Sequence, residues 1–441
     1  MDARIAELRS ANPAETIEAP AEAQSIVVVG LGYVGLPLAV ALARSFPTMG
    51  LDISAERVAE LARGEDRTGE VEPDRLAAST LGYASDPAVC APADVYIVTV
   101  PTPVDERNRP DLRALIAASE MVGTMLDPAR RPLVIFESTV YPGVTEELCV
   151  PAMERASGLV WKQDFVVGYS PERINPGDRE HTVDRIVKVV AGDSPETAAR
   201  VAAIYERVTS GGTFRAASIK AAEGAKAIEN AQRDINIAFM NEATRIFSKL
   251  DVSIWDVLDA ARTKWNFLPF QPGLVGGHCI GVDPYYLSHR AIELGHMPEV
   301  IPAARRVNDD MGRWIADTLS AKMLGRRLHV LVMGVTFKED VPDIRNSKVI
   351  DLVRRLQYHG HGVTLHDPHA DPAEAEAEYG VRIDGEAFTR TYDLVVAAVP
   401  HQAYRAMDDD DLAALIAPDG LFADVKGAFR SRALGCPYWT L

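Results

Sequence analysis

The chain has 441 residues and a formal net charge of −17 at pH 7. Such an acidic chain lacks the positive face that nucleic acid or an anionic membrane needs in a partner, so any anionic ligand must be held by local groups. Hydrophobic residues make up 47% of the chain, which is enough for two or three buried cores. The sequence contains no run of about 18 apolar residues, the length that predicts a membrane-spanning helix, so we expect a soluble protein.

Residues 1–24 are rich in alanine and glutamate and lack the apolar centre of a signal peptide. We expect a flexible arm. The four cysteines, Cys90, Cys149, Cys279 and Cys436, are far apart and form no C-x-x-C pair. This spacing indicates neither a disulfide framework nor a zinc site, and it favours a reducing, cytoplasmic location.

A cluster of histidines lies in "HGHGVTLHDPH", at His359, His361, His366 and His369. Its apolar centre is typical of a short strand and its flanks of surface turns. We therefore predict no metal site there.

In chain order, residues 25–210 alternate short apolar runs with helical stretches. The expected strands are "SIVVVG", "TMGLDI", "DVYIVTV" and "PLVIFEST". Strand and helix in turn predict a parallel, doubly wound sheet.

Residues 211–325 are predominantly helical, with one long proline-free helix expected over residues 219–250. From residue 326 to 441 the alternation of strand and helix returns, in "RRLHVLVMGV", "HGVTLHD", "YDLVVAAVP" and "GLFADV". The predicted class is therefore α/β, with two Rossmann-like doubly wound domains joined by a central helical domain.

The segment "VVVGLGYVG" places Gly30, Gly32 and Gly35 in the order G-x-G-x-x-G, after a strand and before a helix. These glycines permit a tight turn and bring a pyrophosphate close to the helix N-terminus. Asp52 follows about 20 residues later, where a carboxylate binds the adenosine ribose and disfavours a 2′-phosphate. The pattern predicts NAD rather than NADP, although Arg57 could accept that phosphate. A plain glycine turn with Asp52 as a helix cap is the alternative.

On the long helix, Glu223, Lys226, Asn230 and Asp234 recur every three or four residues and share one face. A lysine and an amide together form a donor pair for a developing oxyanion. A solvated face with an ordinary ion pair explains the same spacing.

Two further loops follow expected strands. Ser138 and Thr139 end one strand, and Glu172 lies in "YSPERINPGD" after another. Ligands collect beyond the carboxyl ends of strands in such sheets, but each residue alone is more often a cap or turn residue.

The segment "PGLVGGHCIGVDPYY" surrounds Cys279 with glycines and places Asp283 four residues later. Glycines let a ligand approach the backbone closely, which favours a working thiol over a structural one. A cysteine that holds an aldehyde as a thiohemiacetal can lose a second hydride and leave a thioester for water to cleave. Together with a dinucleotide, this predicts oxidation through an aldehyde to an acid.

Six segments in order, "GLGYVGLPLA", "PTPVDERNRPDL", "STVYPG", "SPERINPGD", "EGAKAIEN" and "PGLVGGHCIGVDPYYL", resemble the UDP-glucose/UDP-mannose dehydrogenase family. The likeness is greatest to its branch that acts on UDP-N-acetylglucosamine or UDP-N-acetylgalactosamine in surface polysaccharide synthesis. The resemblance implies NAD-dependent twofold oxidation of the sugar C6 hydroxyl to a carboxylate, on a dimer joined through the long helix. UDP-N-acetylglucosamine is the favoured substrate and UDP-N-acetylgalactosamine the next.

The resemblance also implies site residues. The catalytic set is Cys279 as nucleophile, Lys226 and Asn230 as oxyanion donors, Asp283 assisting Lys226, Glu172 in thioester turnover and Thr139 placing the water. The NAD contacts are Gly30, Gly32, Tyr33, Val34, Gly35, Asp52, Arg57, Pro101, Thr102, Ser138, Thr139 and Arg345. The substrate contacts are Glu172, Arg173, Lys226, Asn230, Arg233, Phe270, Gly273, Gly276 and Lys338.

Three departures disfavour UDP-glucose as the substrate: Pro176, His278 and Val282 stand where the UDP-glucose enzymes usually carry glutamate, serine and lysine. Trp265 and Phe267 are candidates for the wall around an acetamido methyl group, or for the core. UDP-N-acetylmannosamine and UDP-glucose remain alternative substrates. A β-hydroxyacid-type dehydrogenase, which has no use for Cys279, and a noncatalytic regulator that binds NAD or a nucleotide sugar are the alternative functions.

Overall fold

The computed structural model describes residues 24–90, 92–105, 107–173, 183–277 and 280–441. The described chain divides into two compact units, 24–229 and 230–441, which we treat separately. The predicted arm at residues 1–24 lies almost wholly outside the described residues. The division into domains at 25–210, 211–325 and 326–441 stays a prediction.

The first unit is built on an eight-stranded sheet of order β3-β2-β1-β4-β5-β6-β7-β8. Strands β1 to β6 are parallel, whereas β7 runs antiparallel to β6. The strands are β1 (Ile26–Val29), β2 (Thr48–Leu51), β3 (Gly82–Ala84), β4 (Val95–Val98), β5 (Leu133–Phe136), β6 (Val166–Tyr169), β7 (Lys188–Gly192) and β8 (Thr213–Arg215). β1, β4, β5 and β6 are buried along their whole length, as expected when helices cover both faces of a parallel sheet.

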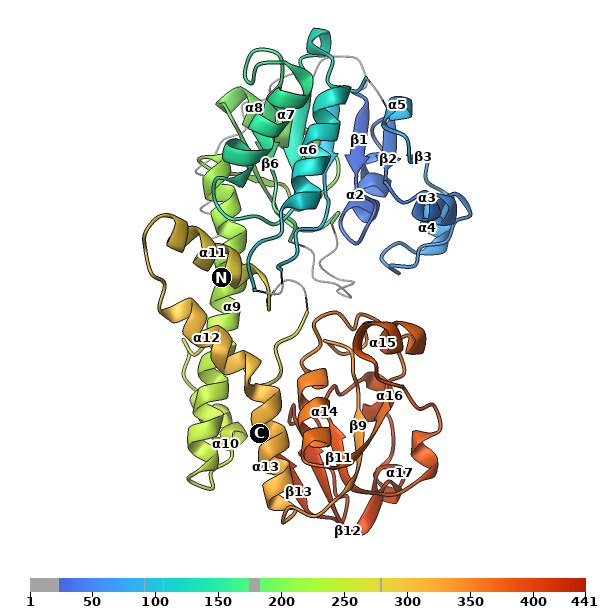
Figure 1. The fold of residues 1–441 in the computed structure, drawn as a ribbon, viewed down its shortest axis with the longest axis vertical. Helices are drawn as coiled ribbons and strands as arrows, with labels where there is room; N and C mark the ends of the chain where they lie inside the picture. Colours follow the sequence, from blue (N-terminus) through green and yellow to red (C-terminus); the bar gives the residue numbers. More distant parts are fainter. Residues whose placement is uncertain (1–23, 91, 106, 174–182, 278–279) are drawn as a thin grey trace. The chain divides into compact units, whose positions relative to one another are not determined.

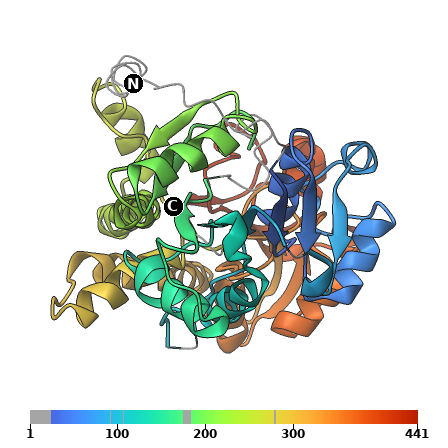
Figure 2. The same cartoon turned by 90° about the horizontal axis from the view of Figure 1, so that it is seen from above.

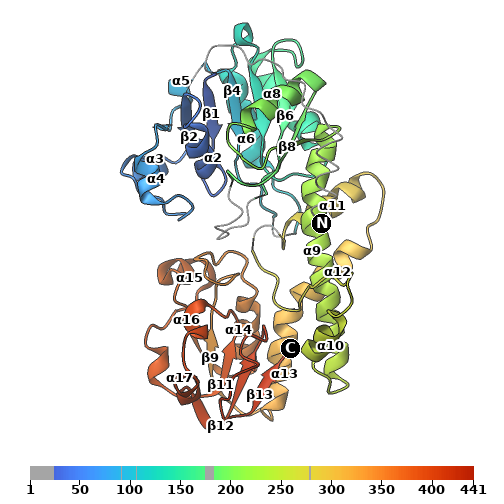
Figure 3. The same ribbon diagram turned by 180° about the vertical axis from the view of Figure 1, so that it is seen from behind.

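Helices cover both faces of this sheet (Figures 1 and 3). α6 and α7 pack against each other on one face, and α8 lies on the other, as the view from above shows (Figure 2). α2 and α8 share one buried cluster with β1, β4 and β5. The helices are α2 (Gly35–Leu42), α3 (Ala55–Ala62), α4 (Pro73–Ala77), α5 (Pro87–Cys90), α6 (Arg113–Met125), η1 (Pro128–Arg130), η2 (Thr145–Cys149), α7 (Val150–Ser157) and α8 (Pro195–Tyr205).

The long helix α9 (Ile219–Ser248) begins in the first unit and continues into the second. Its buried positions recur at helical spacing, and its interior contains no proline to break the hydrogen-bond ladder. The helices that follow are α10 (Ile254–Ala261), α11 (Asp283–Glu293), α12 (Val300–Asp309) and α13 (Met311–Lys322).

The rest of the second unit is a five-stranded parallel sheet of order β10-β9-β11-β12-β13. Its elements are β9 (His329–Met333), α14 (Val349–Tyr358), β10 (Gly362–His366), α15 (Pro372–Tyr379), η3 (Ala387–Thr389), β11 (Tyr392–Ala397), α16 (Gln402–Arg405), α17 (Asp409–Ala414), β12 (Ile416–Asp424) and β13 (Tyr438–Thr440). One apolar cluster joins α10, α13 and α14 to this sheet. Figure 1 shows the ribbons of these helices and of the sheet. The predicted α/β class, two sheets with a helical region between them in the chain, is confirmed, with β7 antiparallel to β6 in the first sheet.

No helix among the described residues is long and apolar enough to cross a membrane. The three described cysteines are free thiols, with Cys90 and Cys149 buried and Cys436 partly buried.

Candidate active site

The glycine turn between β1 and α2 accepts no larger side chains at two of its positions. Gly30 has φ +94°, which L side chains rarely adopt, and a Cβ on Gly35 would lie 1.8 Å from the carbonyl oxygen of Gly30. A Cβ on Gly32, in contrast, would meet nothing within 4 Å. The turn is therefore tight at its ends and open at its middle, at the N-terminus of α2, where a pyrophosphate fits.

Asp52 and Arg57 brace this turn. Asp52 accepts hydrogen bonds from the backbone N–H of Leu31 (2.8 Å) and of Ser54 (2.9 Å). Ser54 is the N-cap of α3, so Asp52 is not the cap. Buried Arg57 donates to the Leu31 carbonyl (3.0 Å) and pairs with Asp66 (2.7 Å). The guanidinium thus holds the loop, and its contact with a nucleotide stays a prediction.

The loops that follow β4, β5 and β6 are cross-linked by side chains. Thr102 donates to the carbonyl of Thr139 (2.6 Å), and Ser138 donates to that of Val100 (2.6 Å). The hydroxyl of Tyr169, the last residue of β6, donates to the carbonyl of Ser138 (3.1 Å). The structure therefore brings Thr102, Ser138 and Thr139 together at the carboxyl edge of the sheet.

Glu172 lies at the same edge and is only 8% exposed. Its neighbour Arg173 donates to the carbonyl of Val187 (3.0 Å) and pairs with Glu229 (2.9 Å). Arg173 is therefore tied to the chain just before β7 and to α9.

The predicted face of α9 is buried. Glu223, Lys226, Asn230 and Asp234 are between 0% and 6% exposed, so a solvated face is wrong. Glu223 accepts from the N–H groups of Gly143 (2.6 Å) and Thr145 (3.0 Å), residues that follow β5. Burial raises the pKa of Glu223 to about 7, although these N–H groups oppose the rise.

In the second unit, two predicted catalytic residues touch: the amide of Asn230 donates to the carboxylate of Asp283, the first residue of α11. One turn later, Asp234 pairs with buried Arg305 (2.6 Å). Cys279 and His278 lie outside the described residues, as does Pro176.

The segment before Cys279 is anchored from α9. The Asn241 side chain accepts from the N–H of Gly273 (2.8 Å) and donates to its carbonyl (3.0 Å). Phe270 and Phe267 pack against the core of this unit, whereas Trp265 is 92% exposed and Arg233 is also exposed. Phe267 is thus a core residue, one of the two roles expected for it.

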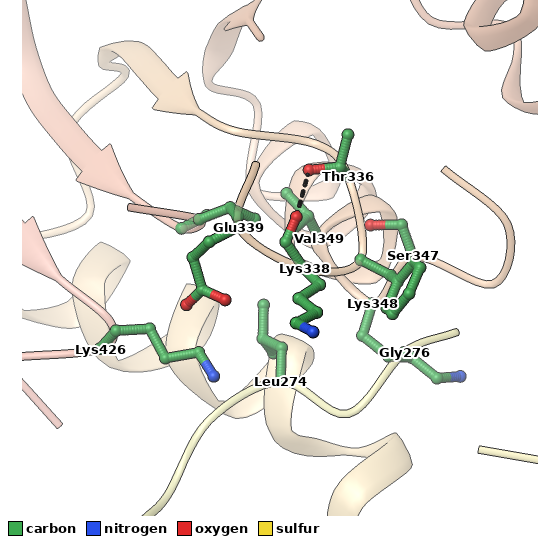
Figure 4. A pocket seen from close by; sticks show the side chains of 12 residues that line it. Leu274, Gly276, Thr336, Lys338, Glu339, Ser347, Lys348, Val349 and Lys426 are labelled. Carbon is green, nitrogen blue, oxygen red and sulfur yellow. Dashed lines mark hydrogen bonds between the residues drawn. The ribbon is translucent and has the colours of Figure 1, made fainter. Parts of the chain in front are cut away.

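A pocket in the second unit gathers lysines from three segments (Figure 4). Lys338 was predicted to contact the substrate. Lys348 and Lys426, which line the same pocket, were not, because a lone lysine in a turn carries no signal in the sequence. The predicted Gly276 also lines it, and Arg345 pairs with Asp343 (2.7 Å). Lys338 and Lys426 supply local positive charge for an anionic ligand here. The Lys348 ammonium is paired with Asp309 (3.0 Å) and Asp351 (3.5 Å), and Glu339 also lines the pocket.

The histidine cluster separates into individual contacts. His359 pairs with Asp317, His361 bonds Ser320, and His366 bonds Tyr404. In the described part of the chain, one group has ligand atoms close enough for a metal: Asp340, His369 and His401. Both ring nitrogens of His401 are already engaged, with the N–H of Asp340 (2.9 Å) and with Asp367 (3.0 Å), so this group is a structural network.

Three sections of the chain match the UDP-glucose/GDP-mannose dehydrogenase family. Residues 24–209 match its NAD binding domain, 220–310 its central domain and 331–431 its UDP binding domain. The family named from the sequence was the UDP-glucose/UDP-mannose dehydrogenase family, and the nucleotide attached to mannose is corrected here from UDP to GDP.

Curated relatives span nearly the same length. Protein CapL of Staphylococcus aureus is 48% identical, over 93% of this chain and 97% of that protein. The UDP-N-acetyl-D-glucosamine 6-dehydrogenases of Pseudomonas aeruginosa and Salmonella typhi are 48% and 46% identical, over 91% and 88% of this chain and 96% and 92% of theirs.

Among solved structures, a UDP-N-acetylmannosamine dehydrogenase from Pyrococcus horikoshii superposes with a TM-score of 0.84 at 26% identity, covering 94% of this chain and 98% of that one. The match confirms the fold, and the NAD binding domain confirms the cofactor predicted from Gly30 to Asp52. The chain therefore belongs to the UDP-glucose/GDP-mannose dehydrogenase family and is an NAD-dependent nucleotide-sugar 6-dehydrogenase.

Proposed function

We propose that the protein oxidises the C6 hydroxyl of UDP-N-acetylglucosamine to a carboxylate through a thioester on Cys279, for the synthesis of surface polysaccharide. The observation that carries the choice of sugar is the 48% identity to an enzyme named for that sugar, over 96% of its length. Relatives named for N-acetylgalactosaminuronic acid and N-acetylmannosamine reach only 33% and 30%. UDP-N-acetylgalactosamine is the next candidate.

The proposed chemistry balances as follows. The C6 alcohol loses a hydride and a proton and becomes an aldehyde, whose carbon is attacked by the Cys279 thiolate. Loss of a second hydride from the thiohemiacetal gives a thioester, and water then breaks the C–S bond, which releases the acid and restores the thiol. NAD supplies the hydride acceptor for both steps, so each sugar consumes two NAD and one water.

The remaining residues bind, orient and move protons in this scheme. Lys226 and Asn230 donate to the oxyanion that forms at C6, and the contact between Asn230 and Asp283 supports a shared role for these two. Glu172 and Thr139 act on the attacking water, which fits their place at the carboxyl edge of the first sheet. Lys338 and Arg345 bind phosphate, and the pocket that Lys338 lines together with Lys426 supports this role for Lys338.

The test of this function is the NADH formed per nucleotide sugar consumed. UDP-N-acetylglucosamine, UDP-N-acetylgalactosamine, UDP-N-acetylmannosamine and UDP-glucose are offered separately to the purified protein. We expect two NADH per sugar, the count that a C6 alcohol oxidised to an acid requires, and the fastest rate with UDP-N-acetylglucosamine. One NADH per sugar would refute the thioester route, and a faster rate with another sugar would refute the substrate.

We also propose that the protein is a homodimer joined through α9. Phe239, Ile246 and Leu250, at and just beyond the C-terminal half of this helix, are 63%, 55% and 63% exposed, and their spacing places them on one side. Apolar side chains aligned in this way are typical of an interface. A second copy of the chain is the expected occupant because a self-complementary helix face pairs readily about a twofold axis.

The double variant Phe239→Asp/Ile246→Asp is expected to sediment at the mass of one chain, since four buried charges would face each other across the interface. Lys249→Asp, which lies off this stripe, is the control and should leave the mass of the wild-type dimer unchanged. A double variant that still sediments as a dimer would place the interface elsewhere.

A further inference from the structure

The first unit buries an ion pair beneath the loops proposed to act on the thioester. The ammonium of Lys188 lies 2.9 Å from the carboxylate of Glu137, and both side chains are fully buried. Glu137 also accepts a hydrogen bond from the hydroxyl of Tyr205, the last residue of α8. The Lys188 ammonium sits 4.9 Å from the centre of the Tyr205 ring.

A buried ion pair of this kind contributes little net free energy to folding. The desolvation of two charges roughly cancels their attraction, and apolar residues of the same volume often serve as well. The cluster therefore calls for a role other than holding the fold together.

The location of the cluster indicates that role. Glu137 directly follows β5 and precedes Ser138 and Thr139. The Lys188 ammonium also reaches the carbonyl of Pro171, at 3.5 Å, and Pro171 precedes Glu172. One side chain thus links the segments that carry two of the proposed catalytic residues.

The antiparallel direction of β7 delivers Lys188 to this edge. Tyr169, the last residue of β6, pairs with Ala191 in β7, so the start of β7, at Lys188, lies beside the carboxyl end of β6. A parallel strand would begin at the far edge of the sheet. Arg173 makes a second link, to the carbonyl of Val187, so Glu172 is bracketed by contacts with two consecutive residues.

Electrostatics agree with this arrangement. Burial raises the pKa of Glu137, the charge of Lys188 opposes the rise, and the nearby carboxyl of Glu172 adds to it. Glu172 therefore lies close enough to the buried pair to interact with it.

We propose that Lys188 is a positioning residue, which holds Glu172 in place for thioester hydrolysis through the carbonyl of Pro171 and through Glu137. The inference rests on the role proposed above for Glu172. Lys188 is not expected to affect the hydride-transfer steps, because Lys188 contacts the segments that carry Glu172 and Thr139.

The test is a single-turnover experiment that follows NADH and, by mass spectrometry of quenched samples, the acyl group on Cys279. In Lys188→Met, the rate constant for loss of the acyl group is expected to fall at least about tenfold, as misplacement of a catalytic group by an ångström can cost more than that. The rate constants of the two NADH-forming steps, and the Kd of the sugar nucleotide measured by binding without NAD, should change by less than about threefold.

Lys188→Met leaves Glu137 buried without its counter-charge, so Glu137→Gln/Lys188→Met provides a neutral version of the cluster. It should show the same selective slowing. Tyr96→Phe is the matched control. Tyr96 lies in β4 of the same sheet, and the substitution removes its buried hydrogen bonds with the N–H of Ala93 and the carbonyl of Met125. It should leave all three steps unchanged.

Loss of the acyl group at the wild-type rate in the double variant, or equal slowing of all steps, would overturn the inference. The same measurements on the wild-type enzyme and on Glu172→Gln distinguish a failure of this inference from a failure of the proposed function. If the wild type forms no acyl adduct, or if Glu172→Gln hydrolyses it normally, the proposed function itself fails, and the inference fails with it.

Discussion

Replacing Cys279 by serine is expected to lower the formation of uronic acid by at least about 1,000-fold, since losses of this size or larger follow removal of a catalytic nucleophile. A serine hydroxyl is hardly ionised at neutral pH and adds poorly to an aldehyde without a base. The product is measured by chromatography of the nucleotide sugars, alongside NADH.

Cys436→Ser provides the control for this variant, because Cys436 is a partly buried free thiol in the second unit. It should form acid at the wild-type rate. If Cys279→Ser forms uronic acid at the wild-type rate, the reaction does not pass through a thioester on Cys279.

Replacing Lys226 by methionine is expected to lower kcat by about 100-fold or more, the usual loss when one oxyanion donor is removed. Methionine keeps much of the length and apolar stem of lysine, so the loss reports on the ammonium group. Steady-state kinetics with a saturating sugar nucleotide provide the measurement.

Lys220→Met is the matched control, because Lys220 lies on the same helix but at its exposed start, 2.9 Å from Glu147. It should retain wild-type kcat. A loss of less than about threefold in Lys226→Met would count against Lys226 as an oxyanion donor.

Much of the fold could be predicted from periodicity. The apolar runs of β1, β4 and β5 and the proline-free helical pattern of α9 are strong local signals. β13 escaped prediction because Tyr438–Thr440 is too short for a period to show. The reversal of β7 also escaped, since "KVVAG" is compatible with either strand direction.

The residues of the candidate site could also be predicted only in part. Gly30, Gly32, Gly35 and Asp52 were predictable because their order and spacing carry the chemistry. Lys188 and Glu137 were not, because an isolated lysine or glutamate looks like a surface residue until the fold brings the two together. The burial of Lys226 and Asn230 excludes the solvated face that spacing alone left open, while their role as oxyanion donors stays a prediction.

The buried carboxyl of Glu223 has a further thermodynamic consequence. Its pKa is about 7 in the folded protein, chiefly because burial disfavours the charged form, and near the ordinary value for glutamate in the unfolded chain. At a pH between these two pKa values, Glu223 is more protonated in the folded chain than in the unfolded one, so folding takes up protons in this pH range. The stability that Glu223 contributes is complete below the lower value and declines as the pH rises toward 7. The stability of the contact between α9 and the loop after β5 therefore depends on pH just below neutrality.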